Sequence, residues 1–206
     1  MIKKYIYYLI GVIFLALGVT LTLVSDLGAG GWDALTENLY KLTGVSIGTW
    51  VIIVAVTLLI ISAILRKEFI NYKVFITSIV LGKLIDFFYI FLAPLRELDS
   101  ILIRIIILIV GLLVIGSGCA ITFVTKLPKN HTEEFVFSVA KVTKFSYQKA
   151  KTIVDISALV IAVIIGIKLQ DFSNLGLGTI LNSFFMGTIV HYCMPTASKC
   201  MENFSE

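Results

Sequence analysis

Six apolar stretches, each about twenty residues long, are the feature that most constrains how this chain can fold. A helix rises about 1.5 Å per residue, so a helix of that length crosses the hydrocarbon core of a bilayer. Hydrophobic residues make up 58% of the 206 residues, which is more than a soluble domain of this size can bury. The sequence therefore predicts an all-α membrane protein with six transmembrane helices, expected near 5–25, 46–65, 73–94, 100–124, 149–168 and 175–195.

The first long interruption of the apolar pattern, at 26–45, predicts a short helix that does not span the bilayer. It opens with glycines that allow a sharp turn, Gly28, Gly30 and Gly31. Apolar residues then recur at helical spacing, while charged residues occupy another face. A similar segment follows one hundred residues later. We therefore expect short amphipathic or re-entrant helices at 31–43 and 131–143.

An internal repeat divides the chain into two halves. An offset of one hundred, without a gap, places Gly11 over Gly111 and superimposes the two amphipathic segments. Each half, 1–97 and 98–206, then holds three spans and one short helix. Because three is odd, the second half is expected to enter the membrane upside down relative to the first. The chain is thus predicted to form one integral membrane domain from two inverted three-helix repeats, an arrangement of many secondary transporters.

The basic residues predict the orientation in the membrane. With the N-terminus inside, most of the 17 lysines and arginines fall on the cytoplasmic side. The cytoplasmic set has twelve members: Lys3, Lys4, Arg66, Lys67, Lys73, Lys126, Lys129, Lys141, Lys144, Lys149, Lys151 and Lys199. We therefore expect a multi-pass protein of the plasma membrane with cytoplasmic N- and C-termini.

Three segments carry a resemblance to known membrane proteins. The first is a Gly-rich turn before Trp-Asp, in LGAGGWDAL followed by TGVSIGT. The second combines a Leu-Pro turn, a short helix and a span with an aspartate, in KLPKNHTEEFVFSVAKVTKFSYQKAKTIVDISALV. The third is a final span that contains glycine and threonine, GTILNSFFMGTIV. Together they resemble the YczE/YyaS/YitT family, with the second segment closest to YitT-like members, over about residues 10–195. The chain departs from the pattern at Gly31, where proline is common, and at Lys83. The resemblance implies an integral membrane protein and brings no catalytic motif.

Charged residues inside the spans are the first candidates for a binding site. Asp155 lies about two turns into the fifth span, where an uncompensated carboxylate costs at least about 2.5 kcal/mol at the bilayer centre. It is either a proton- or cation-responsive group in a central cavity or the partner of Lys151, four residues earlier. Lys83 and Asp86 form either a ligand site or a local ion pair. We place the candidate site near the midplane, within reach of all three, with Asp155 pairing across the bundle with Lys83.

The short helices supply the other candidates, Asp33, Glu37 and Glu133. One interpretation is structural: an acid in the first turn compensates the helix N-terminus, and Glu37 pairs with Lys41. In the other interpretation, these helix N-termini line vestibules for a polar ligand on opposite sides of the membrane. Asn130 and Thr132 are both candidate N-caps for the second short helix.

Four glycines are expected to allow close helix packing: Gly11, Gly18, Gly111 and Gly118. The sequence has no nucleotide-binding loop, nucleophile motif or metal-ligand spacing, so we expect no enzyme activity, no cofactor and no metal. Its lysines sit in short loops between apolar runs, which argues for the lipid bilayer and against nucleic acid as a partner. The three cysteines are expected to form no disulfide.

The leading functional hypothesis is a small transporter or permease for an unknown small polar or ionic solute, with a homodimer as one assembly to consider. Its basis is the inverted repeat with short helices in corresponding places. Two alternatives are kept. One is a substrate-binding membrane subunit of an ATPase-energised importer; the other is an accessory membrane protein that transports nothing.

Overall fold

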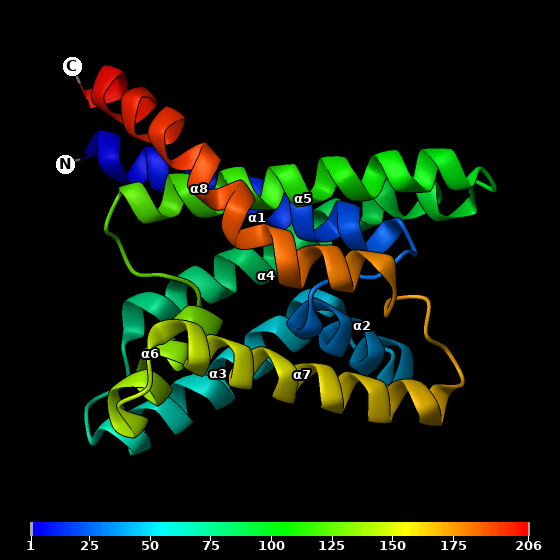
Figure 1. The fold of residues 1–206 in the computed structure, drawn as a ribbon, viewed down its shortest axis with the longest axis horizontal. Helices are drawn as coiled ribbons and strands as arrows, with labels where there is room; N and C mark the ends of the chain where they lie inside the picture. The colour runs from blue at the N-terminus through cyan, green and yellow to red at the C-terminus, as the bar shows by residue number, and fades with distance from the viewer. Residues whose placement is uncertain (1, 206) are drawn as a thin grey trace.

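The computed structural model describes residues 2–205, and the regular structure of these residues is entirely helical (Figure 1). Six long helices have the length and composition of membrane spans. The elements in chain order are α1 (Ile2–Val24), α2 (Gly31–Thr43), α3 (Ile47–Arg66), α4 (Tyr72–Leu92), the 3₁₀ helix η1 (Ala93–Glu97), α5 (Ile101–Val124), α6 (His131–Thr143), α7 (Tyr147–Leu169) and α8 (Leu177–Ser205).

The two short helices, α2 and α6, have the predicted bounds. The side chain of Asn130 accepts a hydrogen bond from the backbone N–H of Glu133, as predicted for an N-cap. Gly44 ends α2 in the left-handed conformation. The apolar faces point inward as expected, with Leu35 and Leu39 packed in one cluster and Phe135 and Val139 in another.

The last span is longer than predicted. The sequence pattern placed its end at residue 195, where Pro195 lacks the backbone N–H that continues a helix. The structure carries α8 through this proline to Ser205. Loss of one hydrogen bond is therefore not enough to end the helix here.

Four glycines lie where α1 packs closely against α5: Gly11, Gly18, Gly111 and Gly118. A Cβ on Gly11 would lie 2.8 Å from Cγ2 of Thr122, and one on Gly111 would lie 2.9 Å from Cγ2 of Thr22. Any side chain at these positions would push the two helices apart. The contacts also match in pairs at the offset of one hundred.

Each short helix packs on a long helix from the other half of the chain. Helix α2 lies on α7, and α6 lies on α3 (Figure 1). Both ends of the described chain lie at one end of the bundle together with α6, and α2 lies toward the other; we call these the terminal end and the distal end. The inverted relation of the halves, and their boundary at residue 97, stay predictions.

Helices α3 and α4 pack tightly, whereas α7 and α8 do not pack closely within the described residues. A Cβ on Gly48 would lie 1.9 Å from the backbone oxygen of Gly82, so the two backbones touch. A Cβ on Gly187 of α8 would meet no atom within 4 Å. The N-terminal part of α2 lies near both α7 and α8, because Gly31 approaches Asp155 and Gly30 approaches Asn182.

Candidate functional site

The candidate site is a group of polar side chains from α2, α6 and α7, centred on Asp155. The indole N–H of Trp32 donates to Oδ1 of Asp155 at 3.2 Å. Lys151 Nζ lies 3.3 Å from Oδ2, which confirms the local pairing predicted from their spacing. Asp155 therefore joins α2 to α7, and its side chain remains 41% exposed.

Glu133, the acid in the first turn of α6, joins the same group through Lys151. Lys151 Nζ lies 3.1 Å from Oε1 of Glu133, and the hydroxyl of Tyr147 donates to Oε2. The lysine thus bridges two carboxylates from different helices, so moving α6 against α7 must change its coordination.

Asp33, the acid in the first turn of α2, lies near this group. Among the described residues, its carboxylate forms no hydrogen bond and no ion pair. A Cβ on Gly30 would lie 2.9 Å from Oδ2 of Asp33 and 2.4 Å from the amide nitrogen of Asn182. Burial raises the pKa of Asp33 to about 7, with further contributions from the negative charges of Asp155 and Glu37. Near neutral pH this carboxyl therefore exchanges a proton readily.

The group combines three carboxylates with one ammonium, a net charge of −2 when all four are ionised. Protonation of Asp33 changes that to −1. Such a balance favours cations over anions. No cluster of three or more histidine, cysteine or acidic side chains within residues 2–205 is arranged to hold a metal ion.

Glu37 lies in a separate, distal charge cluster. Its side chain is fully buried, and Oε1 pairs with Arg96 and, at 3.7 Å, with Lys41 as predicted. Arg96 also lies 2.9 Å from Asp26 and donates to the hydroxyl of Tyr89 at 2.6 Å. The carboxylate is compensated by protein on one oxygen, while Oε2 has no hydrogen-bond partner within residues 2–205.

Lys83 and Asp86 do not form the predicted ion pair, and neither joins Asp155. Asp86 accepts hydrogen bonds from the backbone N–H of Gly48 at 2.7 Å and from Ser46 Oγ at 2.8 Å, so it caps the N-terminus of α3. Lys83 is exposed on α4 and has no partner among the described residues. Residues three apart share a helix side only loosely, and here one turns inward and the other outward.

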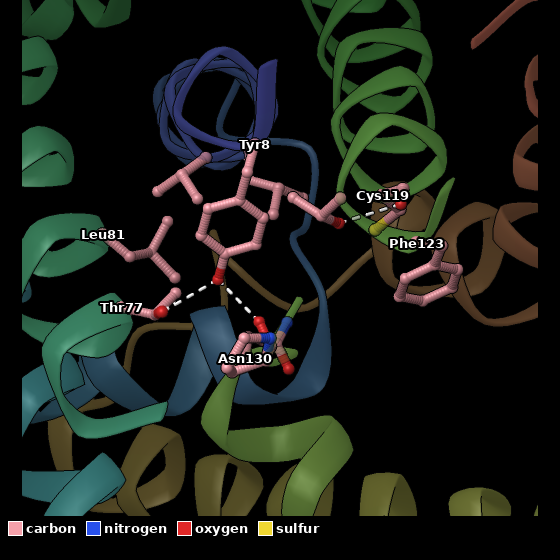
Figure 2. Close-up of a pocket in the computed structure, with 10 residues that line it drawn as sticks. Tyr8, Thr77, Leu81, Cys119, Phe123 and Asn130 are labelled. Carbon is pink, nitrogen blue, oxygen red and sulfur yellow. Dashed lines mark hydrogen bonds between the residues drawn. The ribbon is translucent and has the colours of Figure 1, made fainter. Parts of the chain in front are cut away.

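A small, mostly apolar pocket lies beside the site, between α1, α4, α5 and the 128–130 segment (Figure 2). The hydroxyl of Tyr8 donates to the backbone oxygen of Pro128 at 2.6 Å and lies 2.8 Å from Thr77 Oγ1. On the same side of α6, buried His131 is 3.0 Å from Ser78 Oγ, and burial lowers the pKa of its ring to about 4. These bonds fix the entry to α6.

Sequence reasoning missed Trp32, Tyr147 and Arg96 as members of these clusters. Trp32 directly precedes Asp33 in the Gly-rich motif, so its position in the sequence indicated that it lies near the candidate site. Its partner Asp155 is 123 residues away, however, and spacing alone cannot reveal such a contact.

Comparison with known proteins assigns the chain to a family. A model described as a family of unknown function, DUF6198, matches residues 2–195. The chain belongs to the DUF6198 family. The DUF6198 chain is 32% identical to the uncharacterized protein YyaS of Bacillus subtilis (strain 168) over 196 residues, covering 95% of this chain and 94% of the relative. It is 24% identical to the uncharacterized membrane protein YczE of the same strain over 202 residues, covering 98% and 90%.

These relatives confirm the YczE/YyaS part of the expected resemblance, while the YitT-like assignment stays a prediction. No solved structure matches the chain. With six apolar helices and a membrane-protein relative, this DUF6198 chain is a multi-pass integral membrane protein.

Proposed function

We propose that the chain is a small transporter that moves a small polar or ionic solute across the plasma membrane, with both termini in the cytoplasm. The observation that carries the proposal is the polar group around Asp155. Charged groups persist inside a membrane mainly where protein or water compensates them, and such groups commonly mark solute or ion pathways.

The origin of the site residues supports transport over simple structural pairing. Trp32 and Asp33 come from the first turn of one short helix, and Glu133 from the first turn of the other. All three lie near Lys151 and Asp155 on α7. In inverted-repeat transporters the solute site also lies between the halves, at the ends of short helices.

The test is charge displacement in proteoliposomes on a solid-supported membrane. The probes are sodium, potassium, ammonium, guanidinium and choline, with phosphate as the anionic comparison. We expect at least one cation to give a saturable current that Asp155→Asn reduces by tenfold or more, while Asp99→Asn in an exposed loop leaves it unchanged. Currents that are absent for every probe, or equal in both variants, would contradict the proposal.

A double substitution separates the functional role from local pairing. If Asp155 serves only to neutralise Lys151, then Asp155→Asn combined with Lys151→Gln restores the current of the wild-type protein. Continued loss in the double variant, with normal yield of folded protein, is the result expected for a solute-binding carboxylate.

One observation favours a second function, that of a membrane subunit working with a partner chain. Lys83 is the twelfth residue of α4 and is exposed, with no ion-pair partner in the part of the chain that the structure describes, and Ile76 and Phe87 on the same face are also exposed. A lysine this far from both helix ends is costly against lipid. A partner helix with a carboxylate at this depth would compensate it. Under this alternative Lys83→Leu releases a partner, whereas under the leading proposal it leaves transport intact.

A further inference from the structure

Two ion pairs occupy matching places in the two halves of the chain. Lys41 Nζ lies 2.7 Å from Oδ2 of Asp171, and Lys141 Nζ lies 2.6 Å from Oε1 of Glu68. Each lysine is in the last turn of a short helix. Each acid follows the end of the long helix on which that short helix packs, since α7 ends at Leu169 and α3 at Arg66.

The backbone holds both acids in the same way. The preceding residues, Gln170 and Lys67, have left-handed φ values of 53° and 55°. The N–H of Asp171 then bonds to the oxygen of Gly166 at 3.2 Å, and the N–H of Glu68 bonds to that of Ala63 at 3.1 Å. These are helix C-terminal motifs, which fix the direction of the chain as it leaves the helix.

The pairs lie at opposite ends of the bundle. The loop with Glu68 and the end of α6 are at the terminal end, whereas the loop with Asp171 and the end of α2 are at the distal end (Figure 1). Each pair therefore ties a short helix of one half to the end of a long helix of the other half.

The two pairs differ in their surroundings. At the distal end Lys41 is 19% exposed, also bonds Ser173 at 2.9 Å, and contacts the buried Glu37 cluster. At the terminal end Lys141 is 63% exposed and Glu68 46% exposed. Glu68 also lies 3.4 Å from Arg66, which in turn binds Glu134 of α6 at 2.6 Å. Exposed ion pairs contribute little to stability and weaken with salt, whereas less exposed pairs are screened less.

We propose that these two ion pairs are latches that close opposite ends of the bundle, and that the terminal latch opens before the distal latch. The difference between the two latches is the exposure of their lysines, since Lys41 is 19% exposed and Lys141 is 63% exposed. The terminal end opens toward the aqueous side that also holds the chain termini. This inference rests on the proposed transport function, because opening one end at a time is how a single internal site serves two sides of a membrane.

The test measures distances, not transport. Single cysteines are introduced in a background lacking Cys119, Cys193 and Cys200, at the exposed equivalent positions Leu42 and Phe172 for the distal end, and Val142 and Phe69 for the terminal end. Spin labels on each pair report distance distributions in nanodiscs. Glu68→Gln and Asp171→Asn are compared with Asp99→Asn as the matched control.

We expect Glu68→Gln, or salt raised to about 1 M, to add a longer distance at the terminal end and to leave the distal end unchanged. Exchanging the charges, Lys141→Glu with Glu68→Lys, should restore the shorter distance. Equal responses at both ends, or opening of the distal end alone, would overturn the order of opening. If the protein transports a solute but no latch variant changes a distance, the latch proposal is rejected and the transport proposal stands. If the latch variants change the distances as expected but no solute gives a current, only the transport proposal is rejected.

Discussion

The third and fourth helices of each half pack differently: α3 and α4 are in close contact, whereas α7 and α8 are not. In the first half α3 and α4 touch through Gly48 and Gly82, and Asp86 caps the start of α3. In the second half α7 and α8 stay apart, and the first turn of α2 lies near both. The sequence has Gln148 where the first half has Gly48, so the backbones cannot meet in the same way. The comparison teaches that the first half provides a tightly packed helix pair, α3 with α4, whereas the separation of α7 and α8 in the second half leaves space for polar side chains.

The largest effect is expected from adding a methyl group at the contact between α3 and α4. Gly48→Ala would place a Cβ 1.9 Å from the oxygen of Gly82, which forces the helices apart. We expect a loss of about 3 kcal/mol or of folded protein altogether. Gly187→Ala, with open space around it, should change stability by less than about 0.5 kcal/mol. Thermal unfolding in detergent measures both; equal effects would break the comparison.

The aspartates of the two halves should separate stability from activity. Asp86→Ala removes the acceptor of two hydrogen bonds and should destabilise the protein by about 2 kcal/mol. Asp155→Asn keeps the shape of a more exposed side chain and should cost less than about 1 kcal/mol while removing transport. Unfolding curves and solute currents on the same preparations test this; a fully stable Asp86→Ala protein would remove the capping role.

Stability should depend on pH through Asp33. Its pKa is raised from 3.8 to about 7 in the folded protein, chiefly by burial. Between these values the folded chain binds a proton that the unfolded chain does not, so stability from this group is full below pH 4 and is lost as pH rises through 7. Melting temperature should therefore fall between about pH 4 and pH 7, and Asp33→Asn should reduce that fall. An identical pH profile in the variant would exclude Asp33 as its source.

The smallest effects should come from the lysines at the bundle ends. Lys141→Gln removes a largely exposed pair and should lower stability the least, by an amount that disappears at high salt. Lys41→Gln removes bonds to Asp171 and Ser173 beside a buried glutamate, and should cost about 1–2 kcal/mol. Denaturation at low and high salt measures the difference, which would vanish if both ends were equally solvated.

The sequence predicted the elements more completely than their contacts. Helical spacing gave the bounds of both short helices, and the aligned glycines marked the α1–α5 contact, because both signals are local or repeated. The pairing of Lys151 with Asp155 followed from a spacing of four residues. The positions of Lys83 and Asp86 did not follow, since the rotation of a span about its axis depends on neighbours that an apolar pattern does not specify. For the same reason Trp32 could not be assigned to Asp155.

The placement of each short helix on the opposite half also sets an order of events during synthesis. Asn38 of α2 donates to the backbone of Ala162, 124 residues later in the chain. While the ribosome is still making those residues, α2 lacks α7, the long helix of the other half on which it packs, and the face that α7 will cover lies in the membrane interface. Helix α6 emerges after α3 is already in place and can dock at once. The first half of the protein therefore stays incompletely packed until α7 has been synthesised. A membrane chaperone that protects α2 during that interval would speed folding without changing the folded structure.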